Sequence, residues 1–314
     1  MAQYLVTGGA GFIGSHIVEA LVGRGESVRV LDNLSTGKTE NISPWLDHID
    51  FVHGDLIDLN TVRSACRGID YVLHQGALPS VPKSVADPIA SNSANVSGTL
   101  NVLVAARDEG VRRLVYAGSA AAYGDAPGLP KREDMPANPL SPYAIAKYTG
   151  ELYCLAFHSL YGLDTVVFRY FNVFGPRQDP TSQYAAVIPK FITALQAAKP
   201  PTIFGDGEQS RDFAYVTNVV EANLLACEAP EAPGNIINIA SGERRSLNEL
   251  IALLHGILGC DTPPVYTEAQ PGDVRHSVAD TSRARDLLGY RISVPLEEGL
   301  RLTAEHFRRR GLPG

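Results

Sequence analysis

Long apolar runs, paired cysteines and an excess of basic residues are all missing from this chain of 314 residues. No stretch approaches the roughly 20 apolar residues that a transmembrane helix needs, so we expect no association with a membrane. The cysteines are far apart and form no Cys-x-x-Cys pair, which is typical of reduced thiols in a cytoplasmic protein; they are Cys66, Cys154, Cys227 and Cys260. We expect no bound metal ion.

The charge balance argues against a nucleic-acid-binding surface, because the net charge is −7. An anionic ligand would therefore have to be held by particular Arg and Lys residues. The chain is 45% hydrophobic and 19% charged and has no low-complexity run, so we expect a full hydrophobic core. Its length suits one large domain or two modest ones.

The N-terminal region has the pattern of a strand, a glycine turn and a helix. Tyr4-Leu-Val-Thr7 is a β-type run, and the turn carries Gly8, Gly11 and Gly14. Helical spacing follows over residues 15–24. Glycines at these positions allow the tight turn, the approach of a pyrophosphate and the close packing of helix on strand. The helix N-terminus would then face the phosphates of a dinucleotide.

A second predicted strand, Ser27-Val-Arg-Val-Leu31, leads directly to Asp32. An acid at this position accepts hydrogen bonds from an adenosine ribose and repels a 2′-phosphate, which favours NAD over NADP. The alternative is an aspartate that only forms a turn or caps a helix.

Strands and helices continue to alternate along the chain, which predicts an α/β fold with a doubly wound, Rossmann-type parallel sheet. Ligands bind such sheets at the carboxyl ends of the strands. Further strands are expected over 49–52, 70–74, 113–117, 165–169 and 235–239, and a helix over 89–109. The residues expected at or just past strand ends are Gly8, Asp32, Asp55, Gln75, Ser119 and Asn172.

After about residue 172 the chain becomes rich in turns, with helices expected near 186–197, 217–228 and 246–258. We therefore expect an NAD-binding Rossmann domain over residues 1–171 and a smaller C-terminal α/β lobe over 172–314 that binds the substrate. Segments near 213–240 are expected to return to the first domain and complete its sheet.

Ser119, Tyr143 and Lys147 form the predicted catalytic set. In a helix, Tyr143 and Lys147 lie one turn apart on the same face, so an ammonium lies near a phenol. A phenol has a pKa of about 10, and a nearby cation lowers it by stabilising the phenolate. Tyr143 would then be the acid/base, and the Ser119 hydroxyl would share the transferred proton. Taken alone, the Tyr-x-x-x-Lys pattern also fits a solvated helix face, and the glycine turn decides between the two.

With these motifs in order, the chain resembles the extended short-chain dehydrogenase/reductase family, and more narrowly its UDP-sugar 4-epimerases, over nearly its whole length. The matching segments are Thr7–Gly14, Gly54-Asp-Leu56, Tyr123-Gly-Asp125, Ser141–Lys147, Arg169-Tyr-Phe-Asn172 and Arg211-Asp-Phe213. The resemblance implies a tightly held NAD that is reduced and reoxidised within each turnover. It also implies a homodimer formed through a four-helix bundle that includes the Tyr143 helix.

The resemblance assigns site residues one by one. For NAD it implies Gly8, Gly11, Phe12, Ile13, Gly14, Asp32, Asn33, Asp55, Leu56, Gln75, Ala77, Asn95, Tyr143, Lys147 and Tyr170. For the UDP-sugar it implies Ser80, Ser119, Asn172, Gln178, Val187, Phe204, Arg211, Asp273, Arg275 and Ser277.

The reaction type follows from missing acids. The related 4,6-dehydratases carry an Asp-Glu pair just after the Ser or Thr, whereas Ser119 is followed by Ala120-Ala-Ala122. The elimination of water that a dehydratase performs therefore lacks its general acid and general base. The remaining reaction is oxidation and reduction at C4 of the sugar. The expected substrates are UDP-glucose/UDP-galactose, together with UDP-GlcNAc/UDP-GalNAc. The alternatives are a UDP-glucuronate 4-epimerase and a non-catalytic protein that binds NAD or a nucleotide sugar.

Several substrate-side residues have competing interpretations. Phe204 could belong to the core, and Arg211 could pair with Asp206 or Asp212. Related epimerases often place an Arg where this chain has Gln270, so either Arg275 substitutes or the diphosphate is bound more weakly. Glucose-restricted relatives have a Tyr at the position of Ser277, and the small serine leaves room for a 2-acetamido group. His74 and His276 are expected to be hydrogen-bonded histidines without a catalytic role.

Overall fold

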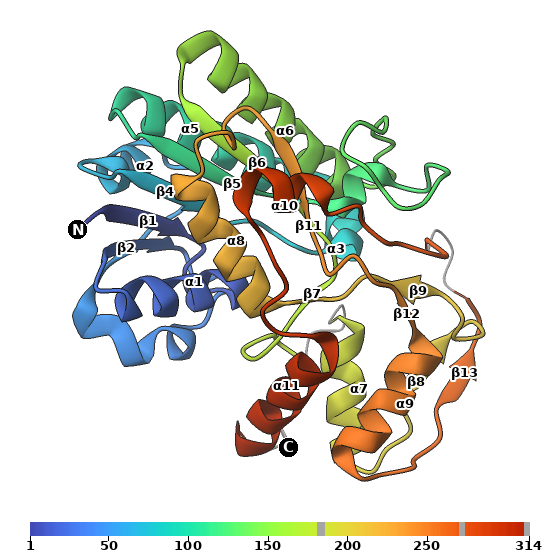
Figure 1. The fold of residues 1–314 in the computed structure, drawn as a ribbon. Helices are drawn as coiled ribbons and strands as arrows, with labels where there is room; N and C mark the ends of the chain where they lie inside the picture. The colour runs from blue at the N-terminus through green and yellow to red at the C-terminus, as the bar shows by residue number, and fades with distance from the viewer. Residues whose placement is uncertain (181–185, 270–273, 311–314) are drawn as a thin grey trace.

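The computed structural model describes residues 1–180, 186–269 and 274–310. Within them, seven parallel strands form one sheet in the order β11-β6-β5-β4-β1-β2-β3 (Figure 1). The strands are β1 (Gln3–Thr7), β2 (Ser27–Asp32), β3 (Ile49–His53), β4 (Tyr71–His74), β5 (Arg113–Ser119), β6 (Asp164–Tyr170) and β11 (Ile236–Ile239). The predicted α/β fold with a doubly wound parallel sheet is confirmed.

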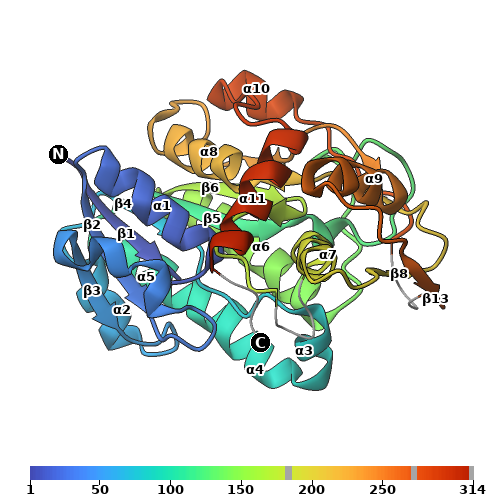
Figure 2. The ribbon, with the colours of Figure 1, turned by 90° about the horizontal axis from the view of Figure 1, so that it is seen from below.

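Helices cover both faces of the sheet (Figure 2). One face carries α1 (Phe12–Gly23) and α8 (Val216–Glu228), which pack against each other. The other carries α2 (Leu59–Cys66), α5 (Gly98–Asp108) and α6 (Pro142–Tyr161). The helix predicted over 89–109 consists of α4 (Pro88–Asn92), a π-helical stretch (Ser93–Ser97) and α5. Among the described helices, none combines the length and the apolar character that crossing a bilayer requires.

The core is divided by the sheet because neighbouring side chains of a strand point to opposite faces. Leu5 of β1 lies in the cluster under α2 and α5, and the adjacent Val6 lies in the cluster under α1 and α8. Both side chains are fully buried. The strands consequently lack the polar alternation of a half-exposed sheet.

The second half of the chain adds a smaller α/β lobe below the sheet in Figure 1. Its helices are α7 (Val187–Gln196), α9 (Leu247–Leu258) and α11 (Leu296–Arg310), while α10 (Ser282–Leu288) packs near β11. Three short strand pairs join it: β7 (Val173–Phe174) with β10 (Ala214–Tyr215), β8 (Thr202–Phe204) with β13 (Val265–Thr267), and β9 (Ser210–Arg211) with β12 (Arg245–Ser246).

The strand register brings the carboxyl ends of the sheet to one edge. Thr7 pairs with His74, and Ser119 pairs with Tyr170. The residues just beyond these strands therefore meet there. The helix that follows β5 is fixed at both ends. The Ser141 side chain accepts a hydrogen bond from the Ala144 N–H, and Gly162 ends α6 in the left-handed conformation at φ 68°.

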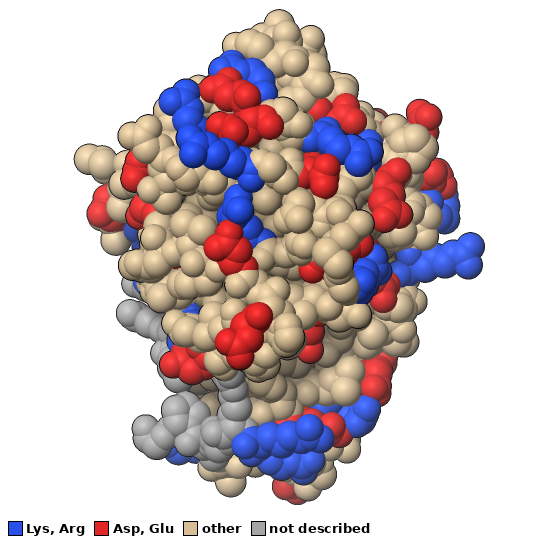
Figure 3. All heavy atoms as spheres, turned by 90° about the vertical axis from the view of Figure 1, so that its left-hand side faces the viewer, with Lys and Arg blue, Asp and Glu red and all other residues tan. Residues whose placement is uncertain are grey.

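The surface mixes charges of both signs. Over the face seen in Figure 3, Lys and Arg side chains are interspersed with Asp and Glu. Ion pairs among the surface residues include Arg63 with Asp108 at 3.2 Å.

Candidate active site

The glycine turn after β1 leaves no room for side chains. Gly8 has φ 66°, and a Cβ there would lie 2.7 Å from the backbone of Gly76. A Cβ on Gly14 would lie 2.1 Å from the Gly8 carbonyl oxygen. Gly11 caps α1 without a side chain, so the N–H groups of Phe12 and Ile13 in the first turn have no intrahelical partner. Glycine at positions 8 and 14 therefore allows the turn to pack this closely, and the N–H groups of the first helical turn lie directly after it.

Acidic and amide side chains lie beside this turn at the ends of β2 and β3. The Asp32 carboxylate accepts hydrogen bonds from the N–H groups of Ala10 (3.0 Å) and Leu34 (2.8 Å), and burial raises its pKa. The bond from Leu34 is the local turn weighed above as the alternative. A carboxylate has about four acceptor sites, so further hydrogen bonds can be accepted. Asn33 donates to Asp55 at 2.8 Å, and Leu56 follows in the same loop.

A polar cluster joins β4, β6 and α8 on the other side of the turn. Gln75 donates to Asn223 Oδ1 at 3.1 Å, and Asn223 donates to the Tyr170 hydroxyl at 2.8 Å. Asn223 is fully buried in α8, and sequence reasoning missed it. Asn95, in the π-helical stretch, bonds both the N–H and the carbonyl of Leu78, at 2.7 and 3.1 Å, which fixes the loop next to Ala77.

The structure brings Ser119, Tyr143 and Lys147 together at the end of β5. The Ser119 hydroxyl hydrogen-bonds the Tyr143 phenol and also accepts the N–H of Ala121 at 3.1 Å. The Lys147 ammonium donates to the Ala117 carbonyl at 2.8 Å and lies over the Tyr116 ring. Burial lowers the pKa of Lys147 to about 8.

The predicted direction of the Tyr143 pKa shift is wrong for this structure. Burial raises the pKa of Tyr143, and the hydrogen bond with Ser119 opposes that rise. The prediction considered only the spacing of Tyr143 and Lys147 along the helix. It did not include the removal of the phenol from water, which disfavours the phenolate.

Two further contacts hold α6, which carries Tyr143 and Lys147, and sequence reasoning missed both. Ser84, in α3 (Val81–Ala86), accepts the Tyr143 N–H at 3.0 Å, while Ser80 caps that same helix. Glu151, one turn after Lys147, forms a buried ion pair with Arg169 of β6 at 2.8 Å. Neither pairing has a local sequence signal, because the partners come from different elements.

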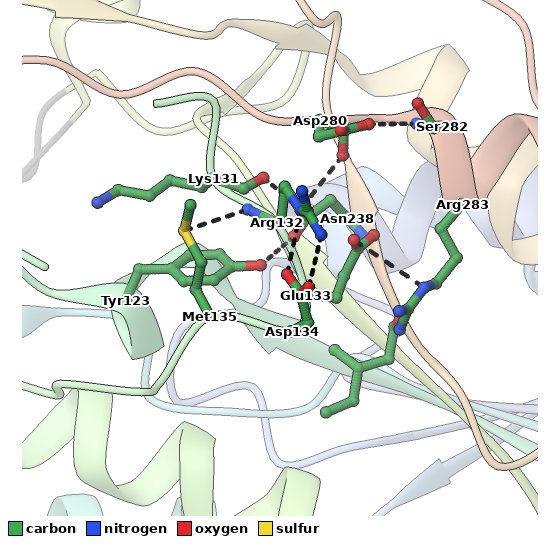
Figure 4. A network of polar contacts seen from close by, with 11 residues as sticks. Tyr123, Lys131, Arg132, Glu133, Asp134, Met135, Asn238, Asp280, Ser282 and Arg283 are labelled. Carbon is green, nitrogen blue, oxygen red and sulfur yellow. Dashed lines mark hydrogen bonds and ion pairs between the residues drawn. The ribbon is translucent and has the colours of Figure 1, made fainter. Parts of the chain in front are cut away.

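Arg169 begins a polar chain into the second lobe. Its guanidinium lies 4.5 Å from the centre of the Tyr123 ring, and the Tyr123 hydroxyl donates to Asn238 at 2.7 Å. Asn238 of β11 in turn donates to the carbonyls of Lys131 (2.9 Å) and Asp280 (3.2 Å), as Figure 4 shows. Hydrogen bonds through Asn238 thereby connect the segment that follows Ser119 with the segment that follows Ser277.

On the substrate side, Asn172 donates to the Asp212 carbonyl at 3.0 Å and Gln178 to the Val173 carbonyl at 3.1 Å. Val187 starts α7. Asp273 and Gln270 lie outside the described residues. Ser277 donates its N–H to the Ser210 carbonyl at 3.0 Å.

Two competing interpretations on this side are wrong. Phe204 is 41% exposed, so it is not a core residue. The Asp206 carboxylate pairs with Arg275 at 2.7 Å. The Asp212 carboxylate accepts the backbone N–H groups of Ser241, Gly242 and Ala279, so neither acid is the partner of Arg211.

The histidines are hydrogen-bonded as expected. His74 is 1% exposed, with Thr7 on one ring nitrogen (2.7 Å) and Thr99 on the other (3.0 Å). Burial lowers its pKa to about 3, so it stays neutral. His276 bonds Ser210 at 2.9 Å.

Comparisons with known proteins agree over nearly the whole chain. Residues 4–240 match the NAD dependent epimerase/dehydratase family. The chain is 40% identical to the UDP-glucose 4-epimerase of Mycolicibacterium smegmatis, over 97% of this chain and 98% of that protein.

The solved structures to which this chain is similar include two 4-epimerases. The UDP-N-acetylglucosamine 4-epimerase from Methanobrevibacter ruminantium, in complex with UDP-N-acetylmuramic acid, is 42% identical with a TM-score of 0.95, over 99% of each chain. The UDP-glucose 4-epimerase of Thermus thermophilus, in complex with NAD, is 39% identical with a TM-score of 0.89, over 98% of this chain and 99% of that one.

Proposed function

The chain belongs to the NAD dependent epimerase/dehydratase family, and we propose that it inverts C4 of a UDP-hexose by transient oxidation with bound NAD. It is thus an NAD-dependent isomerase of the UDP-sugar 4-epimerase type. The observation that carries the proposal is the meeting of Ser119, Tyr143 and Lys147 at the end of β5, where ligands of such sheets bind.

The residues around the glycine turn fit NAD. The N–H groups in the first turn of α1 and the adjoining backbone of Gly8 and Gly11 suit the pyrophosphate. Glycine is required at position 8 because a Cβ there would lie 2.7 Å from the backbone of Gly76. Asp32 suits the adenosine ribose, with Asn33, Asp55 and Leu56 beside it. The polar cluster of Gln75 and Tyr170, together with Ala77 and Asn95, suits the nicotinamide half.

Bound NAD would supply the acceptor and then the donor of the C4 hydride, so no second substrate would be needed. Tyr143 removes the C4 hydroxyl proton and later returns it. Ser119 hydrogen-bonds the C4 oxygen and favours the phenolate of Tyr143. Lys147 would hold the nicotinamide ribose, and the hydrogen bond to the Ala117 carbonyl orients its side chain.

Three alanines follow Ser119 in a 3₁₀ turn, so this turn offers no carboxylate for eliminating water from the sugar. This favours epimerisation over dehydration. An intact acid/base set likewise disfavours a protein that only binds nucleotide sugars.

We assign the UDP-sugar to the second lobe, and NAD to residues 1–171 with the returning segment near 213–240. Phe204 and Val187 would contact the uracil, with Asn172, Gln178, Arg211, Arg275 and Asp273 toward the diphosphate and Ser80 and Ser277 toward the sugar. The exposed ring of Phe204 and the position of Arg211 on β9 support this assignment.

We also propose a homodimer in the reducing cytoplasm. Ile145, Leu152 and Leu160 are exposed at spacings of about two helical turns along α6. Exposed Val85 and Ile89 lie on α3 and α4, which pack beside α6. This apolar face suits a second copy of the chain. The four cysteines are free thiols, which supports the location.

The test adds no cofactor. Purified protein is incubated separately with UDP-glucose, UDP-N-acetylglucosamine and UDP-glucuronate, and each C4 epimer is quantified. Turnover without added NAD is the expected result, because a retained cofactor is regenerated in each cycle. If all three sugars remain unchanged even with NAD supplied, the proposal is wrong.

A further inference from the structure

A cavity of about 320 Å³ lies between the loop that follows the Ser119 turn and the segment just before Ser277. One wall comes from residues 125–131, including Lys131, and the other from residues 274–276. This volume is at the lower end of the range for small-molecule sites. In the sequence, one wall follows the Ser119 turn and the other immediately precedes Ser277, and both of these serines are assigned to the sugar. Lys131 itself has no role in the NAD and UDP contacts assigned above.

The backbone of Lys131 is held in place. Its N–H donates to the Val278 carbonyl at 2.8 Å, and its carbonyl accepts the Asp280 N–H at 2.9 Å. Asn238 donates a second hydrogen bond to the same carbonyl at 2.9 Å. In Figure 4 the Lys131 side chain extends away from this network. The fold therefore fixes the point from which the side chain starts, and the hydrogen bond to the Ala126 carbonyl orients its end.

The Lys131 side chain is buried, and its ammonium forms no direct ion pair in the part of the chain that the structure describes. Lys131 is 4% exposed, and its ammonium donates to the carbonyl of Ala126. Within residues 1–180, 186–269 and 274–310, no carboxylate lies within ion-pair distance of it. Burial lowers its pKa, against the opposing field of Asp125. Removing an ammonium from water costs free energy unless an opposite charge and hydrogen bonds compensate.

The other ionisable groups of the cavity already have partners. Asp125 accepts a hydrogen bond from Asn138 at 2.7 Å. Arg275 pairs with Asp206 at 2.7 Å, and His276 bonds Ser210 at 2.9 Å. Among the described cavity residues, Lys131 is thus the charged group that a ligand can complete.

We propose that Lys131 binds a carboxylate carried by the hexose, so that the preferred substrates are acidic UDP-hexoses. This inference rests on the proposed C4 epimerase function, since the cavity residues lie close in sequence to Ser119 and Ser277, which are assigned to the sugar. A carboxylate can come from C6 of a uronate or from an acidic ether substituent on the ring. Both offer the same charge-assisted hydrogen bond to an ammonium.

The test compares kcat/KM for UDP-N-acetylglucosamine, UDP-glucuronate and UDP-N-acetylmuramic acid in the enzyme with its retained cofactor. One of the two acids is expected to exceed the neutral sugar by about tenfold or more, as a hydrogen bond to a charged group provides. Which acid does so identifies the source of the carboxylate. Lys131→Met should lower this acid-to-neutral ratio by about tenfold, and Lys131→Arg should keep most of it. Arg132→Gln is the matched control, because Arg132 is exposed and pairs with Asp134 at 2.6 Å.

A ratio that Lys131→Met leaves unchanged overturns the inference, as does an equal loss on all three sugars. A wild-type enzyme with a higher kcat/KM for UDP-N-acetylglucosamine than for either acid also overturns the inference, and this result does not depend on whether the variant folds. In each of these outcomes the wild-type enzyme still has epimerase activity. An enzyme inert toward all three sugars instead refutes the proposed function, and this inference with it.

Discussion

Ser84 Oγ accepts the backbone N–H of Tyr143 at 3.0 Å, so a side chain of α3 holds the first turn of the helix that carries the proposed base. Ser84 is 2% exposed and donates its own proton to the Val81 carbonyl at 2.6 Å. Since its donor bond is satisfied within α3, the oxygen is oriented toward α6.

Ser84→Ala should therefore misplace Tyr143 without removing any group that touches the substrate. We expect kcat to fall about tenfold while KM changes by less than about threefold, because small displacements of a base affect the chemical step most. Steady-state kinetics separates the two constants. Ser97→Ala, at an exposed serine in the neighbouring π-helical stretch, is the control. An equal change in KM and kcat would assign Ser84 a general structural role.

Tyr143→Phe removes the proposed acid/base. We expect kcat to fall by about 10³-fold or more, within the range attributed to general acid–base catalysis. Binding of the UDP-sugar, measured by calorimetry, should change by less than about threefold, because the rest of the site is unaltered. Tyr161→Phe, at the exposed end of α6, should behave as wild type. Activity of Tyr143→Phe within tenfold of wild type would rule out Tyr143 as the base.

Ser119 affects the same proton through its hydrogen bond. That bond lowers the pKa of Tyr143 against the effect of burial, so Ser119→Ala should raise this pKa further. Because the active form of the base is the phenolate, the acidic limb of the kcat/KM profile should move to higher pH. Ser119→Thr keeps a hydroxyl and should keep the profile. A lower rate with an unmoved acidic limb would contradict the role given to this bond.

Much of the fold and the centre of the site could be predicted from the sequence. The apolar strand runs and the helical periodicity are local signals, and the side chains after each strand share one sheet edge by topology. The Glu151–Arg169 pair and the position of Asn223 between Gln75 and Tyr170 depend on contacts between distant elements, which no spacing encodes. The Tyr143 pKa was predicted in the wrong direction for a related reason, since burial is a property of the whole fold.

Lys147 should make stability depend on pH. Burial lowers its pKa from 10.5 to about 8, so between these values the unfolded chain binds more protons than the folded one. Stability then rises with pH in this window, and it is lowest where the folded ammonium must stay charged. The free energy of unfolding of wild type relative to Lys147→Met should increase by about 2 kcal/mol between pH 8 and pH 10. Denaturant titrations at several pH values measure it, and a flat or falling difference would contradict the burial of a charged Lys147.

Ser277 is expected to set the size of the substituent accepted at C2 of the sugar. Its N–H is fixed to the Ser210 carbonyl at 3.0 Å, and its neighbour His276 is also bonded to Ser210, so the backbone at this point has little freedom to move away from a larger side chain. A tyrosine here would project its ring into the space that a 2-acetamido group requires. We expect Ser277→Tyr to lower kcat/KM for UDP-N-acetylglucosamine by about tenfold or more, as a steric clash in a packed site does. The kcat/KM for UDP-glucose should change by less than about threefold.

Ser277→Ala is the matched control and should leave the ratio of the two constants unchanged, because it removes the hydroxyl without filling the space. If Ser277→Tyr lowers both constants equally, the residue contacts a part common to both substrates, and the selectivity for the acetamido group must come from elsewhere in the second lobe.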